Sequence, residues 1–256
     1  MISLNEIKKY FSKQEQLIPQ AILKEYLQYK ILEIIFSSKF GNQLAFIGGT
    51  AIRIVYGNDR FSKDIDLDSH GLEEKDFAEL MIIIKRELEK EDLIVEIRNV
   101  YKGVYQCYLR FPKLLFQNKL SNLEDEKILI QIDNFPNQDK LTTKTKVINK
   151  ADIFMQIRTY PPDIILSQKI FALCNRKRAK GRDIYDIIYL FSLTQPNWKF
   201  LKNKIKISNI DELKNKLQSL FTKKDLKNLA QDVEPFLINP KKILRIELFN
   251  EWIKNL

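Results

Sequence analysis

The chain has 256 residues, of which 45% are hydrophobic and 30% charged, so it can bury a substantial core; this excludes disordered, collagen-like and low-complexity proteins. Two cysteines and one histidine exclude a disulfide framework and multi-histidine zinc sites, which leaves carboxylates and lysines as the main chemical groups. A formal net charge of +10 at pH 7 indicates a polyanionic partner.

The first part of the chain predicts a mixed α+β fold. Apolar residues at three- and four-residue steps predict a helix over 17–36, and the apolar run 44–47 predicts a strand that turns at Gly48 and Gly49 into a helix over 51–56. Alternating apolar and acidic residues predict a strand over 65–68, which is followed by a helix over 74–90. Further strands are predicted over 93–100, 104–111, 127–133 and 153–157.

The chain is predicted to be helical from Pro161 almost to its end, with segments over 163–175, 182–193, 210–220, 223–231 and 241–254. The basic excess begins at nearly the same place: residues 158–256 hold 20 Lys/Arg and 10 Asp/Glu, whereas residues 1–157 hold 23 of each. We therefore predict an α+β domain over 1–157 and a basic helical domain over 158–256. The alternative reading of the charge is a solvated lysine-rich face, since 33 of the 43 basic residues are Lys.

The sequence contains no candidate membrane segment. No apolar run approaches the roughly 18 residues of a membrane span, and no apolar signal core follows Met1. We therefore expect a cytoplasmic protein without a membrane partner.

Three carboxylates alternate along the predicted strand over 65–68. The two-residue period of a strand points Asp64, Asp66 and Asp68 to one face, where adjacent anions repel each other. A divalent cation would relieve this repulsion, because carboxylates are hard oxygen ligands that suit Mg²⁺. Taken alone, the pattern also fits a polar strand edge or an aspartate-rich turn.

Two further features support a site at these acids. Gly48, Gly49 and Thr50 join a strand to a helix, where backbone N–H groups can approach a phosphate, although a glycine pair is also common in packing. Asp133 ends another apolar strand. If that strand lies beside the acidic strand, three carboxylates converge on one metal site, as in phosphoryl or nucleotidyl transfer.

The order and spacing of these motifs resemble the AbiEii/AbiGii toxin family of bacterial nucleotidyltransferases. The resemblance covers roughly residues 41–193 and includes the motifs Gly48-Gly49-Thr50-Ala51, Tyr56-Gly57, Arg60-Phe61-Ser62-Lys63-Asp64-Ile65-Asp66-Leu67, Lys169-Ile170-Phe171-Ala172-Leu173 and Arg182-Asp183-Ile184-Tyr185-Asp186. It implies a polymerase-β-like nucleotidyltransferase core followed by a helical lobe. Members act as toxins in toxin–antitoxin or phage-defence (abortive infection) systems, and MenT-like members add nucleotides to the 3′ end of tRNA.

The resemblance also implies roles for individual residues. The metal ligands would be Asp64, Asp66 and Asp133, with Asp133 also a candidate general base. Lys169 would contact the triphosphate, and Asp183 would lie in the active-site cleft. The nucleotide pocket would be lined by Gly48, Gly49 and Thr50, with Ser62 next to the acids.

Several of these residues also have simpler explanations. Lys169 lies mid-way across an apolar helical stripe and therefore needs an anion, unless it snorkels to solvent. Asp183 follows Gly181 at a helix start, where it could serve as a cap. Arg60 and Arg53 are candidate phosphate contacts, although surface solvation is the expected state of Arg53.

We predict a metal-dependent nucleotidyltransferase toxin that moves NMP from an NTP to an RNA 3′ end, with tRNA the first candidate, Mg²⁺ or Mn²⁺ as cofactor and an antitoxin as a possible partner. The RNA phosphates would be held by a basic cluster of Arg176, Lys177, Arg178, Lys180 and Arg182. The alternatives are transfer to a protein hydroxyl or a small molecule, and a non-catalytic module that binds NTP or RNA.

Overall fold

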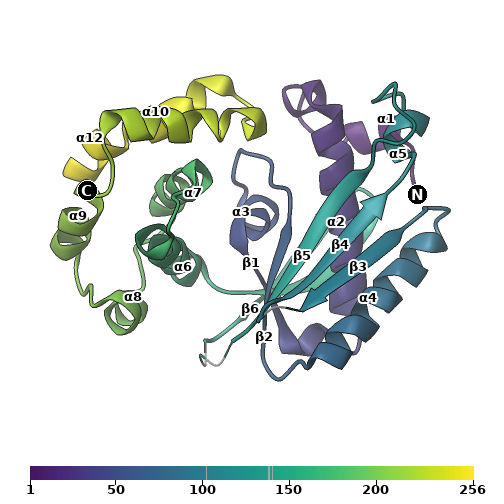
Figure 1. Cartoon of the computed structure of the whole chain (residues 1–256), viewed down its shortest axis with the longest axis horizontal. Coiled ribbons are helices and arrows are strands. Elements are labelled where there is room, and N and C mark those ends of the chain that lie inside the picture. The colour runs from purple at the N-terminus through teal and green to yellow at the C-terminus, as the bar shows by residue number, and fades with distance from the viewer. Residues whose placement is uncertain (102, 138, 140) are drawn as a thin grey trace. The chain divides into compact units, whose positions relative to one another are not determined.

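The computed structural model describes residues 1–256 except 102, 138 and 140, and it divides into two units (Figure 1). The first unit consists of Met1–Val55 and Phe61–Tyr160, and the second of Tyr56–Arg60 and Pro161–Leu256. The second unit thus takes a short segment from the middle of the stretch that we assigned to the first domain. Each unit is described by itself below.

In the described part of the first unit, the strands form one mixed seven-stranded sheet in the order β3-β4-β5-β2-β1-β7-β6 (Figure 1). Their bounds are β1 (Leu44–Ile47), β2 (Ile65–Ser69), β3 (Glu96–Tyr101), β4 (Tyr105–Phe111), β5 (Ile128–Pro136), β6 (Lys144–Lys150) and β7 (Ile153–Thr159). The central strand β2 is antiparallel to β1 and parallel to β5. This sheet confirms the predicted α+β class.

The two long helices of the first unit, α2 (Pro19–Ser37) and α4 (Glu74–Glu89), pack on the sheet. The unit also contains α1 (Leu4–Lys8), α3 (Gly48–Tyr56, whose last residue belongs to the second unit) and α5 (Leu114–Gln117). Helix α2 contacts β5 and β7, α4 contacts β3 and β4, and the two helices contact each other. Pro19 begins α2 at a position where its missing N–H costs no hydrogen bond. The core of the unit includes fully buried Leu27, Phe46, Phe77 and Ile130.

The side chain of Arg53 of α3 is only 11% exposed and is paired, so our expectation that it is solvated was wrong. Its Nε donates to Glu25 Oε2 over 2.9 Å, and its guanidinium also pairs with Glu15. Burial raises the pKa of Glu25, and the charge on Arg53 offsets part of that rise. The ion pair therefore fixes α3, the helix that follows Gly48 and Gly49, against α2.

The second unit is built from helices α6 (Pro162–Asn175), α7 (Gly181–Phe191), α8 (Trp198–Ile205), α9 (Ile210–Gln218), α10 (Lys223–Gln231), α11 (Leu244–Glu247) and α12 (Phe249–Lys254). Helix α7 contacts α6, α10 and α11. The approach of α7 to α10 depends on Gly181, since a Cβ there would lie 2.0 Å from the Leu229 carbonyl oxygen. The helix predicted over 241–254 is instead divided between a 3-10 turn (Pro240–Ile243), α11 and α12.

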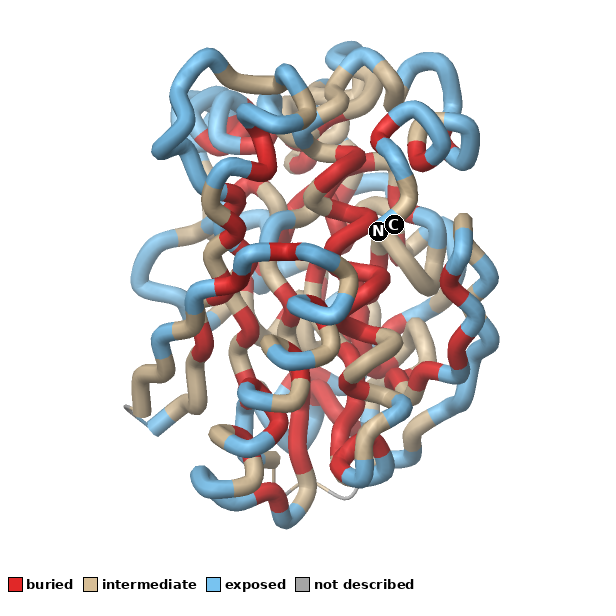
Figure 2. Tube along the Cα trace, turned by 90° about the vertical axis from the view of Figure 1, so that its right-hand side faces the viewer, coloured by how far each residue is buried: buried red, intermediate tan, exposed pale blue. Residues whose placement is uncertain are grey.

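Burial follows the periodicity of the elements, and buried and exposed positions alternate along much of the chain (Figure 2). In β7, for example, Ile153, Met155 and Ile157 are buried, whereas Phe154 is exposed. The neighbouring strand β6 is largely exposed and was not predicted, because Lys and Thr occupy positions that a buried face would fill with apolar residues.

Candidate active site

The register of two parallel strands brings Asp66 and Asp133 together. Asp66 of β2 is the direct Cα partner of Asp133 of β5. Asp64 lies two residues before Asp66, and the hydroxyl of buried Thr50 donates to the Asp64 carbonyl oxygen. The strands predicted from separate motifs are therefore neighbours, as the sequence argument required.

Gly48 lies directly against the carboxylate of Asp66. The residue has φ +76°, and a Cβ built on it would lie 2.0 Å from Asp66 Oδ2. The contact follows from the antiparallel pairing of Ile47 with Asp66, which places the start of α3 beside the acidic strand. Glycine is thus required at this position for two reasons, a left-handed backbone and the absence of a side chain.

Two glutamines that we did not predict hold the carboxylate of Asp133. Gln106 Nε2 donates to Asp133 Oδ1 over 3.0 Å, and Gln131 Nε2 donates to the same oxygen over 2.7 Å. Gln131 lies two residues before Asp133 on the same face of β5. Gln106 lies in the neighbouring strand β4, where it is the direct Cα partner of Asp133. The two-residue period of β5 could have found Gln131, but Gln106 depends on a strand register that the sequence alone leaves open.

The carboxylates of this cluster suit a hard divalent cation, because Mg²⁺ prefers oxygen ligands and two acids lie in register. Among the residues that the structure describes, however, no three His, Cys, Asp or Glu side chains are arranged to hold a metal ion. The three-carboxylate site formed by Asp64, Asp66 and Asp133 therefore stays a prediction.

Asp68 of β2 has polar partners in the first unit. It is 5% exposed and accepts a hydrogen bond of 2.7 Å from Asn137 Nδ2. Burial and the charge on Asp68 raise the pKa of Tyr160, whose hydroxyl lies 3.2 Å from His70 Nε2. This arrangement gives Asp68 neutral polar partners inside the first unit.

The predicted nucleotide-binding residues of the first unit have mixed exposure. Gly49 and Thr50 are buried, whereas Gly48 and Ser62 are half-buried. The Ser62 carbonyl oxygen accepts a hydrogen bond of 3.1 Å from the buried Gln28 side chain, which fixes the segment that leads to Asp64. Their contacts to a nucleotide stay predictions.

In the second unit, Lys169 forms ion pairs with two aspartates of α7. Its Nζ lies 2.9 Å from Asp186 Oδ2 and 3.1 Å from Asp183 Oδ1, and its side chain is 14% exposed. Burial alone would lower the pKa of Lys169, but the two carboxylates raise it above its usual value. Asp183 also accepts a hydrogen bond of 2.5 Å from Arg176 Nη1, and no side chain caps α7, so the capping role was wrong.

Arg60 is buried against Asp186, a partner that we did not anticipate. Its Nε and Nη2 donate to the two oxygens of Asp186 over 2.8 and 2.6 Å, and Asn58 Nδ2 donates to the same carboxylate over 2.9 Å. Burial alone would raise the pKa of Asp186, yet Arg60 and Lys169 hold it below its usual value. The guanidinium expected on a phosphate is 1% exposed in this pair.

Two of the five cations in the predicted RNA-binding cluster contact other side chains of the protein. Arg176 pairs with Asp183, and the guanidinium of Arg182 lies 5.5 Å from the ring centroid of Phe236. Lys177, Arg178 and Lys180 are exposed. Arg176 is exposed as well, although it is paired, so four of the five cations are accessible and Arg182 is half-buried.

A sequence profile of the AbiEii nucleotidyl transferase toxin family, from type IV toxin–antitoxin systems, matches residues 30–250. The chain belongs to this family. The match extends beyond the resemblance over 41–193 and includes most of the basic helical part. The AbiEii protein described here is therefore a nucleotidyltransferase of a toxin family. No curated protein matches its sequence.

Solved structures agree with this fold. MenT4, a nucleotidyltransferase toxin from Mycobacterium tuberculosis, aligns over 100% of this chain and 91% of its own, with a TM-score of 0.58 and 13% identity. JHP933 from Helicobacter pylori aligns over 92% of each chain, with a TM-score of 0.54 and 18% identity. In the described residues of the AbiEii chain, no helix is long and apolar enough to cross a membrane.

Proposed function

We propose that this AbiEii protein transfers NMP from an NTP to the 3′ end of an RNA, with tRNA the first candidate, as the cytoplasmic toxin of a toxin–antitoxin or phage-defence system. The observation that carries the proposal is the pairing of Asp66 with Asp133 in register, with Gly48 against the Asp66 carboxylate. Two in-register carboxylates beside a glycine-lined helix start can serve nucleotidyl transfer.

In this proposal Asp64, Asp66 and Asp133 would hold a divalent ion, Mg²⁺ or Mn²⁺, which would neutralise charge on the triphosphate. Asp133 also accepts the proton of the attacking RNA hydroxyl, since Gln106 and Gln131 fix its orientation. The hydroxyl oxygen forms a bond to the α-phosphorus, the bond to the β-phosphate oxygen breaks, and pyrophosphate leaves. Backbone N–H groups at Gly48, Gly49 and Thr50, with Ser62 beside them, position the NTP.

Lys169 is assigned to the triphosphate, with Asp183 as a neighbouring cleft residue. The raised pKa of Lys169 keeps its ammonium charged, and its pairing with Asp183 and Asp186 fixes where that charge lies. Arg60 supports this arrangement through Asp186. We therefore give Arg60 a positioning role in place of a phosphate contact.

The RNA is held through its phosphates by the exposed cations Lys177, Arg178 and Lys180, with Arg176 and Arg182 anchored beside them. An antitoxin partner follows from membership of a toxin–antitoxin family.

The experiment that tests the proposal supplies the protein with each α-labelled NTP, Mg²⁺ or Mn²⁺, and separate pools of cellular RNA, cellular protein and small molecules. We expect label on RNA, loss of transfer on chelation, and release of pyrophosphate. Sequencing RNA 3′ ends after brief induction in cells then identifies the acceptor. Label on protein or small molecules alone would contradict the RNA proposal, and NTP binding without pyrophosphate release would contradict turnover.

A further inference from the structure

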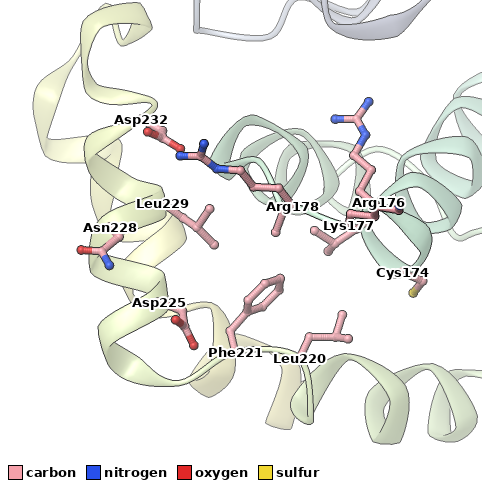
Figure 3. A pocket seen from close by; sticks show the side chains of 12 residues that line it. Cys174, Arg176, Lys177, Arg178, Leu220, Phe221, Asp225, Asn228, Leu229 and Asp232 are labelled. Carbon is pink, nitrogen blue, oxygen red and sulfur yellow. The ribbon is translucent and has the colours of Figure 1, made fainter.

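The helical unit contains a pocket of about 550 Å³ whose lining includes Arg176, Lys177 and Arg178 of the proposed RNA-binding cluster (Figure 3). It lies between the loop after α6, the loop between α9 and α10, and one face of α10. Its volume is within the range of small-ligand sites, roughly 300–1,000 Å³. All of its lining residues belong to the second unit.

An aromatic ring forms the apolar part of this pocket. In Figure 3 the ring of Phe221 lies between the side chains of Leu220 and Leu229. The ring also packs on Phe249, with ring centroids 6.1 Å apart, and the Phe221 carbonyl oxygen accepts a hydrogen bond of 3.0 Å from Asn250 Nδ2. The ring is therefore held in place before any ligand binds, which reduces the entropy cost of stacking on it.

The two walls of the pocket carry opposite polar chemistry. Arg178 and Lys177 line one wall and are exposed, whereas Asn228 and Asp232 of the α10 segment line the other. Figure 3 shows Arg178 extending across the pocket toward Asp232, and Arg176 pointing away from the Phe221 ring. The direction of the Arg176 side chain agrees with its ion pair with Asp183. Cations and acceptors thus face each other above an apolar floor.

We propose that this pocket binds one unpaired base of the acceptor RNA, stacked on Phe221, with its edge on Asn228 and Asp232 and its phosphate on Lys177 and Arg178. Aromatic rings beside cations are the general means of binding single-stranded nucleic acid. Carboxylates accept hydrogen bonds from the exocyclic amino groups of cytosine, adenine and guanine, which uracil lacks. The pocket therefore prefers an amino-bearing base.

An RNA base fits the observations better than an acidic peptide does. A peptide carboxylate would meet the cations but would lie beside Asp232 and Asp225 on the opposite wall, where like charges repel. A base offers donors to that wall and keeps its negative charge on the phosphate. The inference rests on the proposed RNA acceptor, so its test measures binding in the absence of NTP.

The test measures fluorescence anisotropy of labelled RNA tetranucleotides on the full-length protein: A4, C4, U4 and an abasic strand with the same phosphates. We expect A4 and C4 to bind roughly tenfold more tightly than the abasic strand. The affinity of U4 should lie between that of A4 or C4 and that of the abasic strand. F221L keeps an apolar side chain but removes the aromatic face, and N228A removes an exposed amide. Each variant is expected to lose most of the preference for a base.

Lys227→Ala is the matched control, because Lys227 is an exposed residue of α10 outside the pocket lining. We expect it to keep the preference for bases. If F221L fails to fold, N228A still tests the pocket, since its side chain is exposed. R178Q removes a phosphate contact and is therefore expected to weaken the binding of all four strands. The proposal would be overturned by equal binding of the abasic and base-bearing strands to the wild type, or by F221L and N228A keeping the preference for a base.

The outcomes separate this proposal from the proposed function. Base preference that depends on Phe221 and Asn228 without any NMP transfer to RNA would support the pocket and refute the function. Efficient transfer to RNA with pocket variants that bind RNA as the wild type does would support the function and refute the pocket.

Discussion

The carboxylate of Asp66 lies where a side chain on Gly48 would be. An added Cβ would be 2.0 Å from Asp66 Oδ2, and the residue has φ +76°. Gly71 has nearly the same backbone angle, φ +75°, with no heavy atom within 4 Å of its added Cβ, leaving aside its chain neighbours. The two glycines therefore separate the effect of backbone strain from the effect of displacing the acid.

We predict that G71A lowers the free energy of unfolding by about 1–2 kcal/mol, because alanine is strained at positive φ, and that G48A lowers it by at least as much, because it adds the clash with Asp66. Only G48A is expected to abolish NMP transfer, since its methyl group forces the Asp66 carboxylate away. Urea denaturation and labelled-NTP transfer measure the two effects. Full activity in G48A would show that the position of Asp66 beside Gly48 is not needed.

At the residue scale, the spacing of residues in the sequence located important charged side chains but not the residues that they pair with. The alternation around Asp66 and the apolar run before Asp133 located two acids that the fold places in register. The helical wheel correctly indicated that Lys169 needs an anion. Its anions, Asp183 and Asp186, could not be found this way, because they lie on another helix and depend on how α6 packs against α7.

A buried ion cluster connects elements that are distant in the sequence. Arg60, in the segment just before the acidic strand, pairs with Asp186 of α7, which also binds Lys169 of α6. Removing one member of a buried pair leaves the remaining charges without compensation. Loss of one member is therefore expected to destabilise the helical unit.

We predict that D186N lowers the free energy of unfolding by about 3 kcal/mol. K85Q is the matched control, because it breaks an exposed pair with Glu89 on α4, and we expect no measurable change from it. Urea denaturation at pH 7 compares the two. Equal stability of D186N and wild type would contradict the structural role of this cluster.

The carboxylate of Asp186 also makes the free energy of unfolding depend on pH, in a direction that its pKa shift determines. Arg60 and Lys169 hold the pKa of Asp186 below its usual 3.8 despite burial, so its contribution is present above pH 3.8 and is lost as pH falls through the lower folded-state pKa. The acid-induced loss of stability should be shallower in D186N than in wild type. Unfolding curves measured between pH 2 and pH 5 check this.

At the element scale, periodicity predicted elements with a buried face and missed those without one. Strands β1 and β2 and helices α2 and α10 follow the predicted ranges closely. Strand β6 was missed because it is an exposed edge strand rich in Lys, and α8 because its pattern is short. The helix predicted over 241–254 breaks near Leu248, whose backbone leaves the helical range.

The charge of the whole molecule is concentrated in the helical part, but not every cation there is accessible. Arg182 is half-buried against Phe236, whereas Lys177 and Lys180 are exposed, as is Arg176 despite its pair with Asp183. Sequence counts gave the basic excess but could not separate these groups. Nor could they reveal that Tyr56–Arg60 joins the second unit, because this depends on contacts with residues more than 100 positions away.

We predict that K177Q/K180Q weakens RNA binding and reduces the slope of log affinity against log salt by about 2 at most, because each phosphate contact contributes about 0.7–0.9. K85Q/K90Q on α4 changes the net charge equally and is expected to keep the slope. Anisotropy titrations at several salt concentrations measure both. A slope unchanged by K177Q/K180Q would place the RNA surface elsewhere.

The most direct test of the central claim compares D66N with D125N in transfer of α-labelled NMP to RNA. Both variants remove one carboxylate, but Asp125 is exposed and away from the β2–β5 pair. We predict that D66N folds as the wild type does and transfers no detectable label, whereas D125N retains wild-type transfer. A folded D66N that labels RNA at the wild-type rate would contradict the claim that Asp66 and Asp133 carry the chemistry.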